Sequence, residues 1–343
     1  MLTEYRNSEE SFVIAEVGQN HQGSVDEALR YISVFASMGA DAVKFQTRNN
    51  KVLFDNDAYA RTYNSTNAFA STYGEHREML ELPLSCLPEL KAECRRNNVK
   101  FMSTPFDEPS LDALIDIGVD LIKVASFDAG NIPFLEKIGS HNVPVVMSCG
   151  GADLETVKAS VQSLVTAGAT DLGVLHCISE YPSKYDILSL QKVGELKEIF
   201  GEQVVGLSDH FNGILSGPLG YMAGARIFEK HVTFDRSQKG TDHSFALEPD
   251  GFRKFVRDIR RTPEMMKLRE KADLGEEPVF QKLGKSLVYR HDLKKGHQIK
   301  ASDLSSKIFS DHGIPVRKSK ELIGATLAVD ASGGNKCSHS DFV

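Results

Sequence analysis

The sequence predicts a (β/α)8 barrel, the TIM-barrel fold, followed by a small C-terminal domain. Eight short runs of β-branched and other apolar residues recur between residues 12 and 232, and a helical pattern follows each of them. This alternation is typical of parallel βα units, and eight such units suggest a closed barrel. The length of 343 residues leaves room for one further, smaller domain.

The eight predicted strands have the length and composition of buried parallel strands, because each holds three or more apolar residues within five to seven positions. They are residues 12–17, 41–46, 99–104, 119–125, 143–148, 171–177, 204–208 and 226–232.

Helix-start signals lie between these strands. Ser24, followed by Glu27 three residues later, predicts a capping box. Asp153 is expected to cap a second helix, whose apolar stripe extends to Val165. Gly168 stands where that helix should end.

Two segments depart from the alternation. Residues 50–97 are longer than an ordinary βα connection, and such insertions are usually functional. After about residue 265 the alternation stops. We expect a barrel domain at 1–265, a charged linker at 266–281, and a domain of short strands and turns at 282–343. The last is too small to bury much of its own surface, so it should pack on the barrel or on a partner's barrel.

Composition excludes several classes of protein. Apolar residues make up 41% and charged residues 25% of the chain, as in ordinary globular proteins. The net charge of −7 argues against nucleic acid as a partner. Five cysteines without CxxC spacing fit a reducing compartment, and the amino-terminal segment lacks the features of a signal peptide. No apolar run reaches membrane-spanning length, so we expect a cytoplasmic protein without a membrane partner.

Polar side chains gather at the carboxyl ends of the predicted strands, where βα barrels carry their working residues. Lys44 and Gln46 are two residues apart and share a strand face, as do Glu229 and His231, so both pairs can point into the barrel. Taken singly, a strand lysine or histidine is more often structural than functional. The whole set comprises Glu16, Asn20, His21, Lys44, Gln46, Thr104, Lys123, Ser126, Asp128, Ser148, His176, Ser179, Ser208, His210, Glu229 and His231.

Two lysines among these residues, together with hydroxyl groups, predict a pocket for a small substrate that carries both a phosphate and a carboxylate. Such anions are bound by cationic and hydroxyl donors. The donors in question are Lys44, Lys123, Thr104, Ser126, Ser148 and Ser208.

His210 and His231 follow neighbouring strands, and neutral imidazoles with open positions suit Mn²⁺, Co²⁺ or Zn²⁺ catalysis. A pair of histidines is a weak metal signature by itself. A rival interpretation is a Schiff-base aldolase, in which Lys44, Lys123 or Lys230 would be the desolvated nucleophile. The residue pattern leaves both interpretations open.

A series of motifs resembles the sialic acid synthase family, which includes N-acetylneuraminate, legionaminic and pseudaminic acid synthases and spore-coat polysaccharide proteins. The resemblance covers nearly the whole chain, with the motifs in the family's order and spacing. The motifs are AEVGQNHQG at 15–23, GADAVKFQT at 39–47, STPFD at 103–107, KVAS at 123–126, HCISEYP at 176–182, GLSDHFNG at 206–213, and EKHVTFD through GTDHSFALEP at 229–249.

The resemblance implies an activity and an assembly. The enzyme would condense phosphoenolpyruvate with N-acetylmannosamine or a related amino-sugar aldehyde and water, giving a nonulosonic acid and phosphate. Residues 282–343 would form an antifreeze-like (SAF, β-clip) domain that reaches over the active site of the other subunit in a domain-swapped homodimer.

It also implies roles for individual residues. Phosphoenolpyruvate would be held by Lys44, Thr104, Lys123, Ser126, Ser148, Ser179 and Ser208. A divalent metal, typically Mn²⁺ with Mg²⁺ or Co²⁺ as alternatives, would be bound by His210 and His231. Water would be oriented by Glu16 or Asp128. The sugar would be contacted by Gln46, Tyr181 and Asp242.

One departure from the family pattern concerns the sugar. The family carries an arginine in a Lys-Arg-Pro-Gly motif of the C-terminal domain, which reaches the acyl group of the sugar. Here the corresponding stretch is KIFSDHGIP at 307–315, which places Phe309 near that position, with Arg317 as a possible substitute. The acceptor sugar therefore stays open, as does a noncatalytic carbohydrate-binding or assembly role on the same fold.

Overall fold

The computed structural model describes residues 1–270, 273 and 275–343. These residues form two compact units, Met1–Met266 and Lys267–Val343. Within the linker expected at 266–281, residues 271, 272 and 274 lie outside the described residues. No helix in the described part of the chain combines the length and the apolar character needed to cross a membrane.

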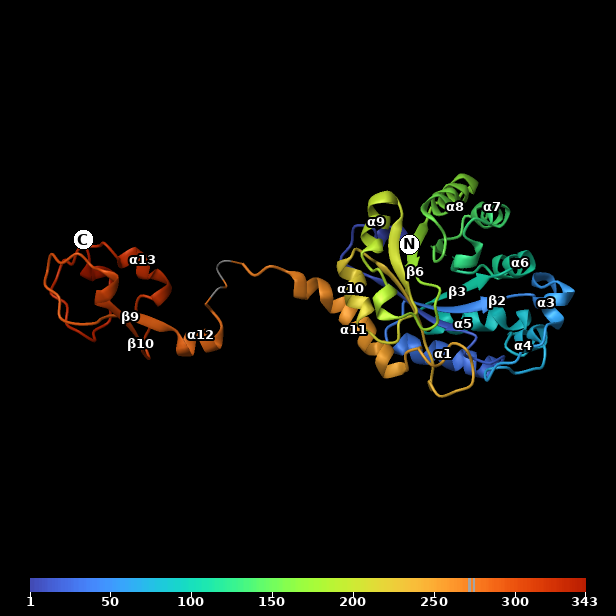
Figure 1. Cartoon of the computed structure of the whole chain (residues 1–343), viewed down its shortest axis with the longest axis horizontal. Coiled ribbons are helices and arrows are strands. Elements are labelled where there is room, and N and C mark those ends of the chain that lie inside the picture. The colour runs from blue at the N-terminus through green and yellow to red at the C-terminus, as the bar shows by residue number, and fades with distance from the viewer. Residues whose placement is uncertain (271–272, 274) are drawn as a thin grey trace. The chain divides into compact units, whose positions relative to one another are not determined.

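The first unit is a closed barrel of eight parallel strands in sequential order, with β8 paired to β1. Figure 1 shows strands of this unit, such as β2, β3 and β6, with helices around them. The predicted barrel is therefore confirmed, and each strand lies within two residues of its expected position. The strands are β1 Phe12–Gly18, β2 Ala42–Thr47, β3 Lys100–Pro105, β4 Leu121–Val124, β5 Val145–Ser148, β6 Leu172–Cys177, β7 Val204–Asp209 and β8 Ile227–His231.

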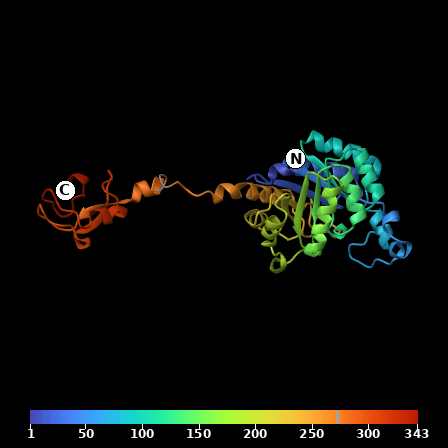
Figure 2. The ribbon, with the colours of Figure 1, turned by 90° about the horizontal axis from the view of Figure 1, so that it is seen from above.

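Helices surround the strands, and Figure 2 shows this outer layer from above. One helix follows most strands, but three short helices precede α5 in the connection between β2 and β3. The helices of this unit are α1 Val25–Ser37, α2 Asn50–Leu53, α3 Asn56–Ala60, α4 Tyr73–Glu78, α5 Leu87–Arg96, α6 Glu108–Asp116, α7 Ile132–Ser140, α8 Leu154–Ala167, α9 Lys192–Ile199, α10 Ser216–Met222 and α11 Pro249–Met266.

The predicted helix ends are largely correct. The Ser24 hydroxyl accepts the amide N–H of Glu27 at the start of α1. The other half of the capping box is absent, because the amide N–H of Ser24 donates to a backbone carbonyl instead. Asp153 caps α8 and Gly168 ends it with a positive φ of 123°. Val165 is 42% exposed, so the apolar stripe does not extend to it.

The barrel interior changes from apolar to polar along the strands. Near the amino ends, the inward side chains are apolar, and Leu2 packs with them. Glu16 lies two residues after Ile14 on β1, and Lys44 lies two residues after Ala42 on β2. These residues share a strand face because side chains alternate. The apolar floor consists of Leu2, Phe12, Ile14, Ala42, Met102, Leu121, Val146, Leu175, Val204 and Ile227.

A buried ion pair joins β7 to β8 on the outer face of the barrel wall. Lys230 Nζ donates to Asp209 Oδ2 at 2.6 Å and also to the carbonyl of Phe211. The lysine and aspartate side chains are at most 1% exposed. Since Asp209 precedes His210 and Lys230 precedes His231, this pair fixes the backbone beneath both histidines.

The second unit has its own core. Its strands β9 Lys285–Tyr289 and β10 Leu304–Ile308 pair antiparallel, and its helices α12 Pro278–Leu283 and α13 Ser319–Leu322 are short. The buried residues of this unit are Leu287, Tyr289, Leu293, Ile299, Leu304, Ile314, Leu322, Leu327, Ala331 and Cys337.

Replacing Lys230 with Met should lower the free energy of unfolding by about 3–5 kcal/mol, because the Asp209 carboxylate would remain buried without its partner charge. Urea denaturation followed by circular dichroism measures this loss. The matched control is Lys254→Met, because Lys254 forms an exposed ion pair with Asp250 at 2.7 Å. The control should lose less than about 1 kcal/mol. Equal losses in the two variants would contradict a structural role for the buried pair.

Candidate active site

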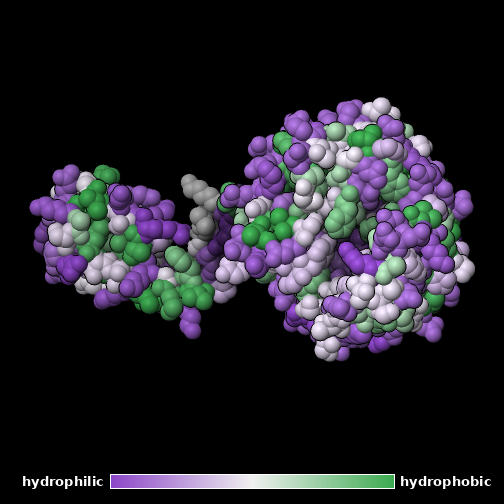
Figure 3. Space-filling model, turned by 45° about the vertical axis from the view of Figure 1, so that its right-hand side comes forward, coloured by the Kyte–Doolittle hydropathy of each residue, from purple (hydrophilic) through white to green (hydrophobic). Residues whose placement is uncertain are grey.

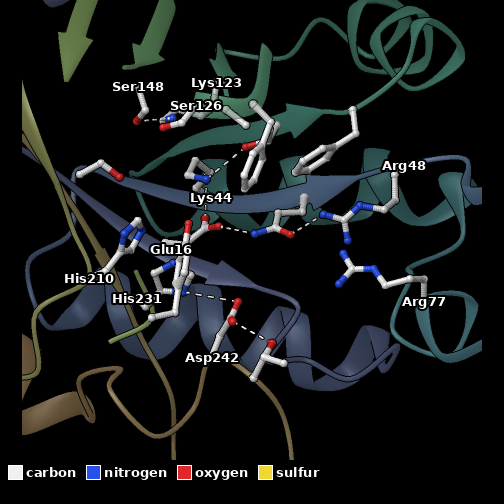
Figure 4. Close-up of a pocket in the computed structure, with 18 of the residues that line it drawn as sticks. Glu16, Lys44, Arg48, Arg77, Lys123, Ser126, Ser148, His210, His231 and Asp242 are labelled. Carbon is white, nitrogen blue, oxygen red and sulfur yellow. Dashed lines mark hydrogen bonds and ion pairs between the residues drawn. The ribbon is translucent and has the colours of Figure 1, made fainter. Parts of the chain in front are cut away.

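A cavity of about 640 Å³ opens at the carboxyl ends of the barrel strands. Figure 3 shows a hollow with hydrophilic residues on this face of the barrel, and Figure 4 shows side chains from several strands pointing into it. Twelve of the fourteen site residues proposed from the sequence line this cavity. They are Glu16, Lys44, Gln46, Thr104, Lys123, Ser126, Ser148, Tyr181, Ser208, His210, His231 and Asp242.

The other two proposed residues, Asp128 and Ser179, are not in the cavity lining. Asp128 ends a 3-10 turn after β4, and its carboxylate accepts the side-chain amide of Asn131 at 3.0 Å. Ser179 lies next to Ser126, because a Cβ built on Gly150 would be 2.6 Å from the Ser179 hydroxyl and 3.0 Å from that of Ser126. The structure therefore places Ser179 beside the cavity wall and Asp128 outside it.

Lys44 occupies the centre of the cavity floor between two carboxylates. Its Nζ lies 2.8 Å from Glu16 Oε2 and 3.7 Å from Glu229 Oε2, and it donates to the Thr104 hydroxyl at 3.1 Å. Burial, with a contribution from Glu229, raises the pKa of Glu16 to about 7. For Glu229 burial acts in the same direction, but Lys44 and Lys123 outweigh it and lower its pKa to about 2. One proton can thus exchange near neutral pH at Glu16.

Lys123 is the cavity lysine without a carboxylate partner at ion-pair distance among the described residues. Its Nζ donates to the Ser148 hydroxyl at 2.7 Å and to the carbonyl of Val124 at 2.9 Å. Burial lowers its pKa. The Ser126 hydroxyl accepts the amide N–H of Gly150 at 3.0 Å. Lys123, Ser148 and Ser126 therefore offer donors to an anion.

His210 and His231 lie next to each other on one side of the cavity, with ring centroids 5.4 Å apart. His210 Nδ1 donates to the carbonyl of Ile178 at 2.8 Å, which leaves the lone pair on Nε2. His231 Nδ1 is buried without a hydrogen-bond partner and lies 3.8 Å from Asp242 Oδ2. Burial lowers the pKa of His231, so its ring is neutral. The Tyr181 ring packs 4.1 Å from that of His210.

Two imidazoles at this separation fit a divalent transition metal as a pair of ligands. The bond from His210 Nδ1 to a backbone carbonyl is the contact typical of a metal-binding histidine, and His231 Nδ1 is a buried ring nitrogen without a partner. Within the described residues, no group of three or more His, Cys, Asp or Glu side chains is arranged to hold a metal. A metal bound here would keep its remaining positions for water or substrate oxygens.

Several residues considered from the sequence are structural. His176 Nε2 hydrogen-bonds the carbonyl of Leu188, and His21 Nδ1 accepts the amide N–H of Gly23. Lys230 does not line the cavity, because it is bound to Asp209 on the outer face of the barrel wall.

Sequence reasoning missed one wall of the cavity. The segment between β2 and β3 supplies Tyr63, Asn67, Tyr73, His76 and Arg77 to the lining, and Arg48 follows β2 directly. The unusual length of 50–97 was the available signal, but it does not reveal which side chains turn inward.

Comparison with known proteins agrees with this arrangement. The model of the NeuB family matches residues 31–271. N-acetylneuraminate-9-phosphate synthase of Drosophila melanogaster is 34% identical over 341 residues and 92% of each chain. N,N'-diacetyllegionaminic acid synthase of Legionella pneumophila is 33% identical, over 94% of this chain and 92% of its own length.

The fold has a solved counterpart. The structure of an N-acetylneuraminic acid synthetase from Leptospira borgpetersenii in complex with citrate has a TM-score of 0.69 and 31% sequence identity. It covers 79% of this chain and 91% of that one. Because the family model spans more than half of the chain and the relatives share about a third of its residues over nearly their full lengths, the chain belongs to the NeuB family.

Proposed function

We propose that this chain is a nonulosonic acid synthase, which condenses phosphoenolpyruvate with an amino-sugar aldehyde and water and releases phosphate. The observation that carries the proposal is the joint presence, in one cavity, of a pair of histidines and a buried lysine that lies among hydroxyl groups and has no carboxylate at ion-pair distance among the described residues. Membership of the NeuB family supports it, as do relatives named as synthases of N-acetylneuraminate 9-phosphate and diacetyllegionaminate.

Phosphoenolpyruvate would bind at Lys123. The ammonium group of this lysine has no carboxylate at ion-pair distance among the described residues, so the anionic substrate would supply a close partner charge. Hydroxyl groups of Ser148 and Ser126 would complete the anion site, with Ser208 and Thr104 nearby. Lys44 is already neutralised by Glu16 and Glu229, and therefore contributes hydrogen bonds more than net charge.

The reaction forms one carbon–carbon bond and breaks one carbon–oxygen bond. C3 of phosphoenolpyruvate attacks the aldehyde carbon, water adds to C2, and the phosphate then leaves with its bridging oxygen. Glu16 would orient the water and accept its proton, and a pKa near neutral supports this role. Asp128 lies outside the cavity, which favours Glu16 in this role.

His210 and His231 would hold the metal, for which Mn²⁺ is our first choice and Mg²⁺ or Co²⁺ are alternatives. When bound, the metal supplies Lewis acidity at the aldehyde oxygen. Gln46, Tyr181 and Asp242 line the same cavity and would contact the sugar.

For the second unit we propose the antifreeze-like (SAF) fold and a place over the cavity of the partner in a domain-swapped homodimer. Its separate core and antiparallel strand pair are compatible with this proposal. Phe309 and Arg317 both belong to this unit, so the acyl group of the sugar would meet one of them. A cytoplasmic location, with no nucleic-acid or membrane partner, completes the proposal.

The first test is phosphate release from phosphoenolpyruvate with Mn²⁺ and a panel of N-acetylated amino sugars. We expect release that depends on the sugar and stops when the metal is chelated. Activity that survives complete removal of metal would contradict the role of the histidine pair. Sugar binding without turnover of any panel member would favour the noncatalytic alternative.

The second test separates the synthase from a Schiff-base aldolase. Lys123→Gln should lower kcat/KM for phosphoenolpyruvate by about tenfold to a hundredfold, mainly through KM, because one charge-assisted interaction is lost. Lys137→Gln is the matched control, since Lys137 pairs with Glu108 and Asp112 on the surface. The control should resemble the wild type.

In the same experiment, wild-type protein treated with pyruvate and borohydride should gain no mass by spectrometry. A stable adduct, absent in Lys123→Gln, would instead establish the aldolase.

A further inference from the structure

A chain of hydrogen bonds leads from the Glu16 carboxylate to a second carboxylate outside the cavity lining. Gln46 Nε2 donates to Glu16 Oε1 at 2.9 Å, and Arg48 Nη2 donates to Gln46 Oε1 at 2.6 Å (Figure 4). At the far end, Arg48 Nη1 donates to Glu81 Oε1 at 2.9 Å. The first three side chains line the cavity, whereas Glu81 does not. Glu81 can therefore act on the reaction only through its neighbours.

The orientation of the Gln46 amide follows from the two groups that it joins. A guanidinium can only donate hydrogen bonds, and an ionised carboxylate can only accept them. A reversed amide would set its NH2 group against the Arg48 guanidinium and its oxygen against the Glu16 carboxylate. The bridge also lies against the main chain, because a Cβ built on Gly18 would be 3.2 Å from Gln46 Nε2 and 3.3 Å from Glu16 Oε1. Gln46 thus has one favourable orientation while Arg48 stays beside it.

Arg48 is held beside this amide by two contacts. Its side chain is 3% exposed, and its guanidinium lies over the Phe106 ring, 4.1 Å from the centroid. Stacking on a ring sets the plane of the guanidinium, and a carboxylate that accepts from it also sets its rotation within that plane. Among the described residues, Glu81 is the carboxylate at ion-pair distance from Arg48. Glu81 is fixed in turn, because its Oε1 accepts the side-chain amide of Gln19 at 2.8 Å.

We propose that Glu81 is a positioning residue for the reaction. By holding Arg48 it fixes the Gln46 amide, and that amide keeps one oxygen of the Glu16 carboxylate in place. The other oxygen of Glu16 lies 2.8 Å from Lys44 Nζ. This inference rests on the proposed function, in which Glu16 orients the water that adds to C2. A displacement of about 1 Å in such a group can lower the rate by about a hundredfold.

The test measures kcat, and KM for phosphoenolpyruvate, in Glu81→Ala. We expect kcat to fall by about tenfold to a hundredfold. KM for phosphoenolpyruvate should stay unchanged, because the hydrogen bond between Lys123 and Ser148 is not affected. Glu81→Gln keeps a carbonyl acceptor for Arg48, so its loss of kcat should be smaller, and it decides the question if Glu81→Ala does not fold. Since burial raises the pKa of Glu81 to about 7, assays at about pH 8 compare both variants with an ionised wild type.

A double-mutant cycle with Gln46→Ala separates positioning from a general loss of structure. Once the Gln46 amide is gone, Glu81→Ala should cause almost no further loss of kcat. A full additional loss in the double variant, an unchanged kcat in Glu81→Ala, or a raised KM for phosphoenolpyruvate would overturn the inference while the synthase proposal stands. Glu89→Gln is the matched control, because Glu89 is an exposed carboxylate of the same β2–β3 connection outside the cavity lining. It should keep the wild-type kcat.

A crystal structure of Glu81→Ala gives a readout that needs no turnover. The Gln46 amide should no longer bridge Arg48 and Glu16, and an intact bridge would refute the inference even in an active synthase. Absence of turnover by the wild type with every acceptor would instead remove the proposed function, and the catalytic meaning of the bridge with it.

Discussion

A buried lysine shared by two carboxylates holds the interior of this barrel together. Lys44 on β2 lies between Glu16 on β1 and Glu229 on β8, so three adjacent strands meet at one ammonium group. Without that charge, two buried carboxylates would face each other at considerable cost. Further hydrogen bonds extend from both ends of this triad. The continuous series is Arg48, Gln46, Glu16, Lys44, Glu229 and Ser208.

This series couples the fold to the chemistry. Because Glu16 is fixed by Lys44 and Gln46, its orientation does not depend on a substrate, and pre-organised groups of this kind lower the cost of reaching the transition state. Lys44 and Lys123 lower the pKa of Glu229, so this carboxylate is ionised. Glu16, whose pKa is about 7, can gain or lose a proton near neutral pH. The apolar floor, which includes Leu2 and Ile14, shields this network from water at the amino-terminal end of the barrel.

Sequence patterns predicted the barrel well because the relevant signals are local. Apolar runs and helix caps depend on neighbouring residues, and eleven of the side chains selected by the strand-end rule line one cavity. Tyr181 and Asp242, which also line it, were predicted only from the family resemblance. Val165 was expected to be buried but is exposed. The spacing of apolar residues in a helix does not show how far around the helix the buried face extends. Asp128 was expected in the site, but it ends a 3-10 turn, accepts a hydrogen bond from a nearby side chain and is not in the cavity lining. Arg77 could not be assigned, because its position depends on the path of an irregular insertion.

The aromatic packing of the β2–β3 insertion has an evolutionary consequence. The rings of Tyr63, Tyr73 and His76 pack against one another, with the centroids of Tyr63 and His76 4.6 Å apart, so this segment has an aromatic cluster of its own. Mutations there can reshape one wall of the cavity while the buried lysine network stays untouched. Relatives named for different sugar products are similarly distant from this chain, at 34% and 33% identity. In a barrel of this kind, mutations in one peripheral segment can change which acceptor sugar is bound, with little loss of folding stability.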